Sequence, residues 1–286
     1  MSAFSIKNTL TNWTFWGKDN TSWSKEEGSI PAYHKIEKLP RKDVPTGQDI
    51  EYVLLKPEAE RPGSQENEVK KLIFVCHGVN RSLDSKSVRQ WQDDATRENV
   101  TIVLHNYPNY GDTPSPRATE KQICRDALQL LNYVRYKHEG EKFRSYEVVI
   151  LGNSIGCGPT MWLATTDAAY HLGIKKVVLI SPWKSLIELL PTLMTSGLPR
   201  FMHGWKLVLQ GIIWDLKNAM DEQVKKNELL NLTSRLEMIP NCGHRATHVD
   251  TAEIIWAFIH DNPNLDKIAF SVVRKQEERR INSGGD

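Results

Sequence analysis

Short runs of branched apolar residues alternate with helical patterns along most of this chain, beginning near residue 50. Several of these runs are apolar without alternation, which is typical of strands that are covered on both faces. The alternation of strands and helices predicts an α/β fold class: one doubly wound, mostly parallel sheet with helices on both faces. The predicted strands are residues 50–55, 71–76, 100–105, 147–152, 175–180, 206–211 and 235–240.

Three helical patterns accompany these strands. The clearest covers residues 119–136 and opens with a Thr119-x-x-Gln122 capping box, followed by apolar residues at helical spacing. A second pattern begins at the glycines after Ser154, and a third covers residues 250–261.

The same patterns divide the chain into three parts. We expect an α/β domain at residues 46–262, because the strand and helix signals fall within this range. It follows an N-terminal extension at residues 1–45, which is polar with an aromatic cluster. Residues 263–286 form a charged C-terminal tail that we expect to be disordered.

Composition argues against several other classes of protein. The 286 residues carry 37 basic and 35 acidic side chains, so the basic surplus typical of nucleic-acid binding is missing. The four scattered cysteines form no C-x-x-C pair and suggest neither zinc nor a disulfide framework. No apolar run reaches the length of about 18 residues that predicts a transmembrane segment, and the N-terminus does not resemble a signal peptide. We therefore expect a cytoplasmic, reduced protein.

The ends of the predicted strands carry the residues that could do chemistry. Sheets of this kind place their working residues in loops at the carboxyl ends of the strands, and three such ends carry Ser154, Asp215 and His244. A serine hydroxyl is a poor nucleophile unless an imidazole accepts its proton and a carboxylate orients that imidazole. The chain order Ser…Asp…His, with the serine in G-x-S-x-G between a strand and a helix, is the arrangement of α/β-hydrolases.

The two glycines of that motif have a predicted steric role. A sharp turn at Ser154 leaves no room for side chains at Gly152 and Gly156, which would collide with the neighbouring strand and helix. The helix that starts behind the serine supplies oriented N–H groups where an oxyanion would form.

On these residues the chain resembles the α/β-hydrolase superfamily over about residues 48–261, and within it the Bem46-type serine hydrolases and related protein depalmitoylases. The resemblance implies that the backbone N–H groups of Val79 and Ile155 form the oxyanion hole. It also implies a small-molecule or acylated substrate, a carboxylic ester or acyl thioester, and a triad that needs no metal or organic cofactor. The matching segments are His77-Gly78, NYPNYGDTPSP (106–116), GNSIG (152–156), LISP (179–182) and CGH (242–244).

The chain departs from that pattern in three places. The family usually has His-Gly-x-x-Asp ahead of the catalytic acid, whereas QGIIWD here is one residue longer, so Asp221 competes with Asp215. Residues 1–75 contain no cysteine, so the lipid anchor of the depalmitoylases, and with it membrane attachment, does not transfer. The segment after LISP is short and predicts a small lid.

Several of these residues also have plainer interpretations. Ser154 could lie in a glycine-rich phosphate-binding turn, although the spacing G-x-G-x-x-G is absent. His244 and His248 could share a metal, but no third ligand is evident, and we favour His244 as a general base. A catalytically inactive binding or regulatory module of the same fold is the alternative function.

Three neighbouring features are not expected to take part in catalysis directly. We expect His77 to brace its loop by hydrogen bonding, and Cys157 and Cys242 to be buried thiols rather than nucleophiles. The Leu- and Met-rich segment at 185–202 fits equally well a helix packed on the sheet or a wall of an acyl-binding pocket.

Overall fold

A computed structural model describes eleven stretches of the chain. The predicted strands at 206–211 and 235–240 and the segment at 185–202 lie outside them. The described residues are 35–42, 48–57, 70–78, 83, 85–108, 110, 119–141, 143–167, 171–182, 248–265 and 267.

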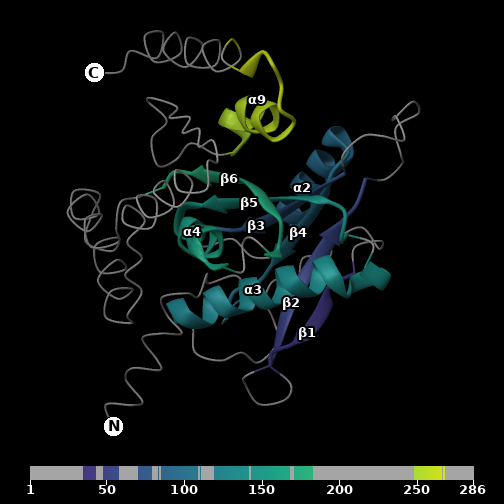
Figure 1. Cartoon of the computed structure of the whole chain (residues 1–286), viewed down its shortest axis with the longest axis vertical. Helices are drawn as coiled ribbons and strands as arrows, with labels where there is room; N and C mark the ends of the chain where they lie inside the picture. The colour runs from purple at the N-terminus through teal and green to yellow at the C-terminus, as the bar shows by residue number, and fades with distance from the viewer. Residues whose placement is uncertain are drawn as a thin grey trace, which may run out of the picture.

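One mixed, mostly parallel sheet forms the centre of the described structure, with six strands in the order β1-β2-β4-β3-β5-β6 (Figure 1). β3 pairs in parallel with β4 and β5, and β5 with β6, whereas β1 and β2 join antiparallel at one edge. The carboxyl ends of β3 to β6 therefore meet at the same side of the sheet. The strands are β1 (Glu37–Pro40), β2 (Asp49–Leu55), β3 (Lys71–Cys76), β4 (Thr101–His105), β5 (Glu147–Asn153) and β6 (Ile174–Ile180).

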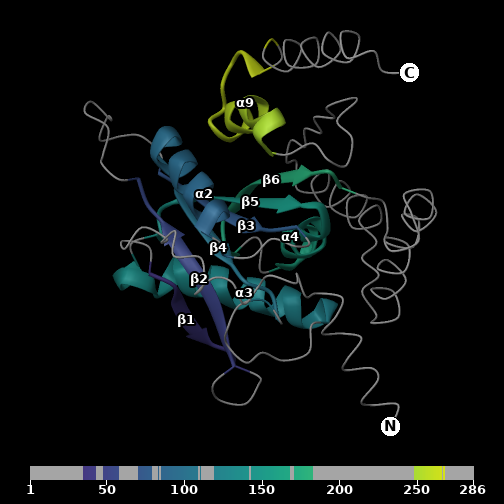
Figure 2. The same cartoon turned by 180° about the vertical axis from the view of Figure 1, so that it is seen from behind.

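Helices cover both faces of this sheet, as Figures 1 and 2 show from opposite sides. Alternate residues of β3 point to opposite faces: Ile73 and Val75 pack in the cluster that includes α2 and α9, and Leu72 and Phe74 in the cluster that includes α3 and α4. The predicted fold class is thereby confirmed. The helices are α2 (Ser85–Glu98), α3 (Glu120–Tyr136), α4 (Cys157–Thr165) and α9 (His248–Ile259).

The central strands explain why the sequence shows apolar runs without alternation. Every residue of β3 and β4 is buried, because helices cover each strand on both faces. The edge strand β1 instead alternates between half-buried and exposed residues, and no sequence pattern predicted it.

A lysine on β6 holds the C-terminal end of α9. Lys176 Nζ donates to the carbonyl oxygens of Phe258 at 3.0 Å and Ile259 at 2.7 Å, and it pairs with Asp261 at 2.6 Å. A cation at this end of a helix satisfies carbonyls that have no partner within the helix and opposes the negative end of its dipole. This contact fixes the helix that follows His244 in the chain.

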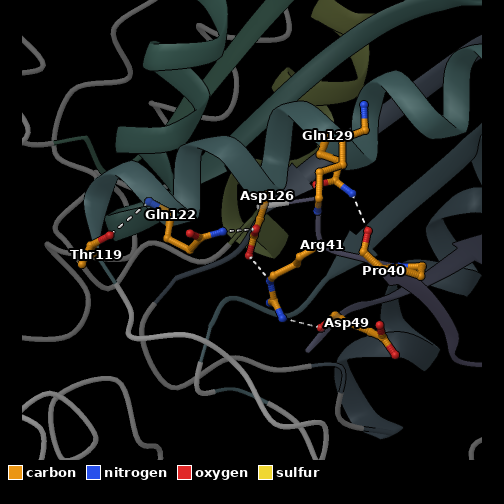
Figure 3. Close-up of polar contacts among 8 residues, drawn as sticks. Pro40, Arg41, Asp49, Thr119, Gln122, Asp126 and Gln129 are labelled. Carbon is orange, nitrogen blue, oxygen red and sulfur yellow. Dashed lines mark hydrogen bonds and ion pairs between the residues drawn. The ribbon is translucent and has the colours of Figure 1, made fainter. Parts of the chain in front are cut away.

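A buried ion pair joins the edge of the sheet to α3 (Figure 3). Arg41 Nε lies 2.8 Å from Asp126 Oδ2, and the two side chains are 2% and 1% exposed. Arg41 Nη1 also donates to the carbonyl oxygen of Asp49 at 2.6 Å, at the start of β2. Gln122 donates to the second oxygen of Asp126 at 2.7 Å, so the buried carboxylate is paired on both sides.

The start of α3 agrees with the prediction from sequence. Thr119 is its N-cap, and the threonine Oγ1 accepts a hydrogen bond from the backbone N–H of Gln122 at 3.1 Å (Figure 3). This confirms the threonine half of the predicted capping box.

Replacing Arg41 with leucine should destabilise the fold strongly, because the carboxylate of Asp126 would stay buried without its cation. We expect a loss of about 3–5 kcal/mol in the free energy of unfolding, measured by urea denaturation. The double variant R41L/D126L removes both charges and should recover part of this loss. Equal stability of R41L and the wild type would contradict the role of the pair.

Candidate active site

Ser154 lies on a sharp turn at the carboxyl end of β5. Its φ is 52°, in the left-handed region that a residue with a side chain seldom adopts. The chain passes from β5 through the short 3₁₀ turn η3 (Ser154–Gly156) directly into α4. Such backbone strain persists only where the surroundings enforce it, and it concentrates at functional sites.

The two glycines of the motif show what enforces the turn. A Cβ at Gly156 would lie 2.0 Å from the carbonyl oxygen of Cys76, at the end of β3. A Cβ at Gly152 would lie 2.6 Å from Thr160 Oγ1 and 2.7 Å from the carbonyl oxygen of Gly156. The predicted collisions with the neighbouring strand and helix are confirmed.

The turn after β3 lies against the serine. A Cβ built on Gly78 would be 3.5 Å from Ser154 Cβ and 3.4 Å from the carbonyl oxygen of Asn153, which is ordinary van der Waals contact. This closeness follows from the parallel pairing of β3 with β5, in which Cys76 is opposite Gly152. The His77-Gly78 segment and Ser154 are thus brought together from parts of the chain about 75 residues apart.

His77 braces this turn, in agreement with the expectation from sequence. Its Nδ1 lies 2.8 Å from the carbonyl oxygen of Gly78, a hydrogen bond that requires the proton on Nδ1. The imidazole stacks on the ring of Tyr107, with centroids 4.1 Å apart and planes 27° from parallel. The hydroxyl of Tyr107 in turn donates to the carbonyl oxygen of His77 at 2.8 Å.

The end of β4 contributes two buried polar residues, Asn106 and Tyr107, to which the sequence analysis gave no individual role. Asn106 is 2% exposed and donates to Glu51 Oε2 at 2.9 Å, while its own Oδ1 accepts from the N–H of Leu83 at 3.1 Å. Burial raises the pKa of Tyr107 well above its usual value, so its hydroxyl keeps the proton that it donates. Both residues lie in the segment NYPNYGDTPSP, and the match of this segment to the family pattern is the sequence signal that could have identified them.

The thiols beside the elbow are poor nucleophiles. Cys157 is buried, and its Sγ lies 3.4 Å from the carbonyl oxygen of Gly152 and 3.5 Å from that of Ile180. Burial raises the pKa of Cys157 above its usual range and the pKa of Cys76 to about 12, so both stay protonated near neutral pH. The expectation of a buried thiol at position 157 is confirmed.

Two of the predicted site residues lie in the described structure: Ser154, and Ile155, which is 3% exposed. The rest fall outside the described residues, so their meeting with Ser154 stays a prediction. These are Val79, Asp215, His244 and the competing Asp221, together with Cys242 and the small lid. His248 is the first residue of α9.

The described residues contain neither a metal-binding cluster nor a membrane-spanning helix. No group of three or more His, Cys, Asp or Glu side chains in them is placed to hold a metal ion. None of the helices in the same stretches is long and apolar enough to cross a membrane.

Solved structures with some similarity to this chain include several hydrolases. One of two esterases from the fungus Rhizomucor miehei is 17% identical over 96% of this chain and 93% of its own, with a TM-score of 0.49. An esterase from Pyrococcus furiosus is 13% identical over 66% of this chain and 65% of its own, with a TM-score of 0.47. A lidless α/β serine hydrolase from Xanthomonas campestris is 15% identical over 53% and 62%, with a TM-score of 0.37.

The chain spans less than two thirds of the length of the last two structures. No family model matches the sequence, and no curated protein matches it. The fold class follows from this chain's own strand order, and its strand–turn–helix elbow is the turn that carries the nucleophile in α/β-hydrolases.

Gly156→Ala should destabilise the protein, because its methyl group would meet the carbonyl group of Cys76 and β3 would have to shift. We expect a loss of about 3 kcal/mol in the free energy of unfolding, measured by urea denaturation. Gly78→Ala is the matched control, since its methyl group would make only ordinary contacts and should keep the wild-type stability. Equal stability of the two variants would contradict the elbow packing.

His105 should make the fold sensitive to acid. Burial lowers its pKa to about 3 from 6.5, so below pH 6.5 the unfolded chain takes up a proton that the folded protein does not. The free energy of unfolding therefore falls as the pH drops from 6.5 towards 3, by about 2 kcal/mol at pH 5. His105→Phe should lose this part of the pH dependence in urea denaturation at pH 7 and pH 5. An unchanged difference would show that another group is responsible.

Proposed function

We propose that the chain is a serine hydrolase that cleaves carboxylic esters or acyl thioesters by way of an acyl-enzyme. The observation that carries the proposal is the position of Ser154, strained at the carboxyl end of a central strand with Gly78 in contact beside it. A positive φ also occurs at Ser181, but at Ser154 it is combined with two flanking glycines that leave no room for a Cβ. The same elbow presents the nucleophile in α/β-hydrolases.

In the proposed reaction, Ser154 Oγ attacks the acyl carbon while His244 takes the hydroxyl proton. The N–H groups of Val79 and Ile155 stabilise the negative oxygen of the tetrahedral intermediate. His244 then gives its proton to the departing alcohol or thiol, and water, activated by the same histidine, releases the acid and frees Ser154. Asp215 orients the histidine, with Asp221 as the other candidate.

This mechanism draws on the side chains and backbone of the chain alone, so the proposal includes no metal or organic cofactor. Its partner is a small-molecule or acylated substrate in the cytoplasm. The neighbouring thiols do not compete for the role of nucleophile, because their raised pKa values keep them neutral near pH 7.

Ser154→Ala should abolish hydrolysis of p-nitrophenyl esters and acyl thioesters, because the acyl-enzyme could not form. We expect kcat to fall by a factor of about 10⁴ or more, which leaves only the contribution of substrate binding and the oxyanion hole. Labelling by a fluorophosphonate, followed by peptide mapping, should mark Ser154 in the wild type and nothing in the variant.

Ser181→Ala is the matched control for this experiment. Ser181 also has a φ of 52° at the end of a neighbouring strand, so the same change there carries the same backbone cost without removing the nucleophile. It should keep wild-type labelling and activity. A wild-type protein that neither labels nor hydrolyses any ester or thioester would point instead to the inactive binding module.

A further inference from the structure

Two adjacent residues at the end of β4 form hydrogen bonds to the two ends of the segment 77–83, in which Gly78 lies against Ser154. The hydroxyl of Tyr107 donates to the carbonyl oxygen of His77 at 2.8 Å, where the segment begins. Asn106 Oδ1 accepts from the N–H of Leu83 at 3.1 Å, where the segment ends. Between these two contacts lies Gly78, whose carbonyl carbon is bonded directly to the amide nitrogen of Val79.

The two residues that make these contacts, Asn106 and Tyr107, are buried and held by further contacts. Tyr107 and Asn106 are each 2% exposed, and the ring of Tyr107 stacks on His77 at 4.1 Å. Asn106 is held by β2 in turn: its N–H donates to the carbonyl oxygen of Glu51 at 2.9 Å, and its Nδ2 donates to Glu51 Oε2 at 2.9 Å. The carboxylate of Glu51 belongs to a residue that is 4% exposed. Buried and paired polar groups of this kind have one geometry available to them.

We propose that Asn106 and Tyr107 are positioning residues, which keep Gly78 against Ser154 and so aim the following amide at the developing oxyanion. The proposal rests on the proposed function. Backbone donors stabilise a transition state only when they are held in place, and a displacement of about 1 Å can cost a factor of about 100 in rate. Their hydrogen bonds go to His77 and Leu83, so their effect acts through the segment at 77–83.

The first test is Tyr107→Phe, which removes the hydroxyl and keeps the stacked ring. We expect kcat for p-nitrophenyl acetate to fall by roughly 10- to 100-fold, with KM nearly unchanged. The rate of fluorophosphonate labelling at Ser154 should fall in parallel, because phosphonylation passes through a similar charged intermediate. Tyr52→Phe is the matched control: its hydroxyl is also in a buried tyrosine, but it donates to Glu37 and should leave kcat unchanged.

The second test exchanges the donor and the acceptor between β4 and β2. Asn106→Asp, assayed at pH 8, places a carboxylate against Glu51 Oε2 and should lower kcat as Tyr107→Phe does. Adding Glu51→Gln restores one donor and one acceptor, and the new carboxylate of the double variant N106D/E51Q can still accept from the N–H of Leu83. We therefore expect the double variant to recover most of the lost kcat.

The outcomes separate this proposal from the proposed function. If the wild type labels at Ser154 and the folded Y107F and N106D variants keep wild-type kcat, the positioning role is wrong while the hydrolase assignment holds. Loss of kcat in Y52F to the same extent, or failure of E51Q to rescue N106D, would also overturn the role. A wild type that does not label at Ser154 would overturn both. Circular dichroism at the assay temperature confirms that each variant is folded.

Discussion

The close approach of the turn after β5 to the end of β3 is the constraint on which the candidate site depends. No side chain fits at position 156, since its Cβ would lie 2.0 Å from a backbone carbonyl oxygen of β3. The chain must therefore pass from strand to helix within three residues, which forces Ser154 into the left-handed region. The same approach brings Gly78 into contact with the serine, so one packing contact places Ser154 and the turn after β3 side by side.

A rigid frame on both faces of the sheet keeps this strained turn in place. The backbone cost of a positive φ at a serine is about 1–3 kcal/mol, which a loosely held loop would relieve by unfolding locally. Here β3 and β5 are buried between α2 and α9 on one face and α3 and α4 on the other. The ion pair between Arg41 and Asp126 extends the frame to the outer strands.

The parts that sequence could predict are those coded locally. β2 to β6 and the helices at 120–136 and 248–259 follow from apolar patterns, and the elbow with the helix at 157–165 follows from a glycine motif. β1 was missed because four residues ending in proline carry little signal, and its stability comes from pairing with β2 and from the bond of Tyr52 to Glu37. Asn106 was missed as a contributor because its partners are 55 and 23 residues away.

The polar groups at the end of β4 provide something that apolar residues would not: they fix the position of the strand as well as stabilising it. An apolar residue at position 106 could pack well in several slightly different positions. The Asn106 amide lies between Glu51 and the N–H of Leu83, and it makes both hydrogen bonds in only one position. A shift of β4 along β2 would leave the buried Glu51 carboxylate without that donor, at a cost of about 1–3 kcal/mol. The register of this edge is therefore fixed by hydrogen bonds, and through β4 it is imposed on the turn at His77 and Gly78, where Gly78 lies against Ser154.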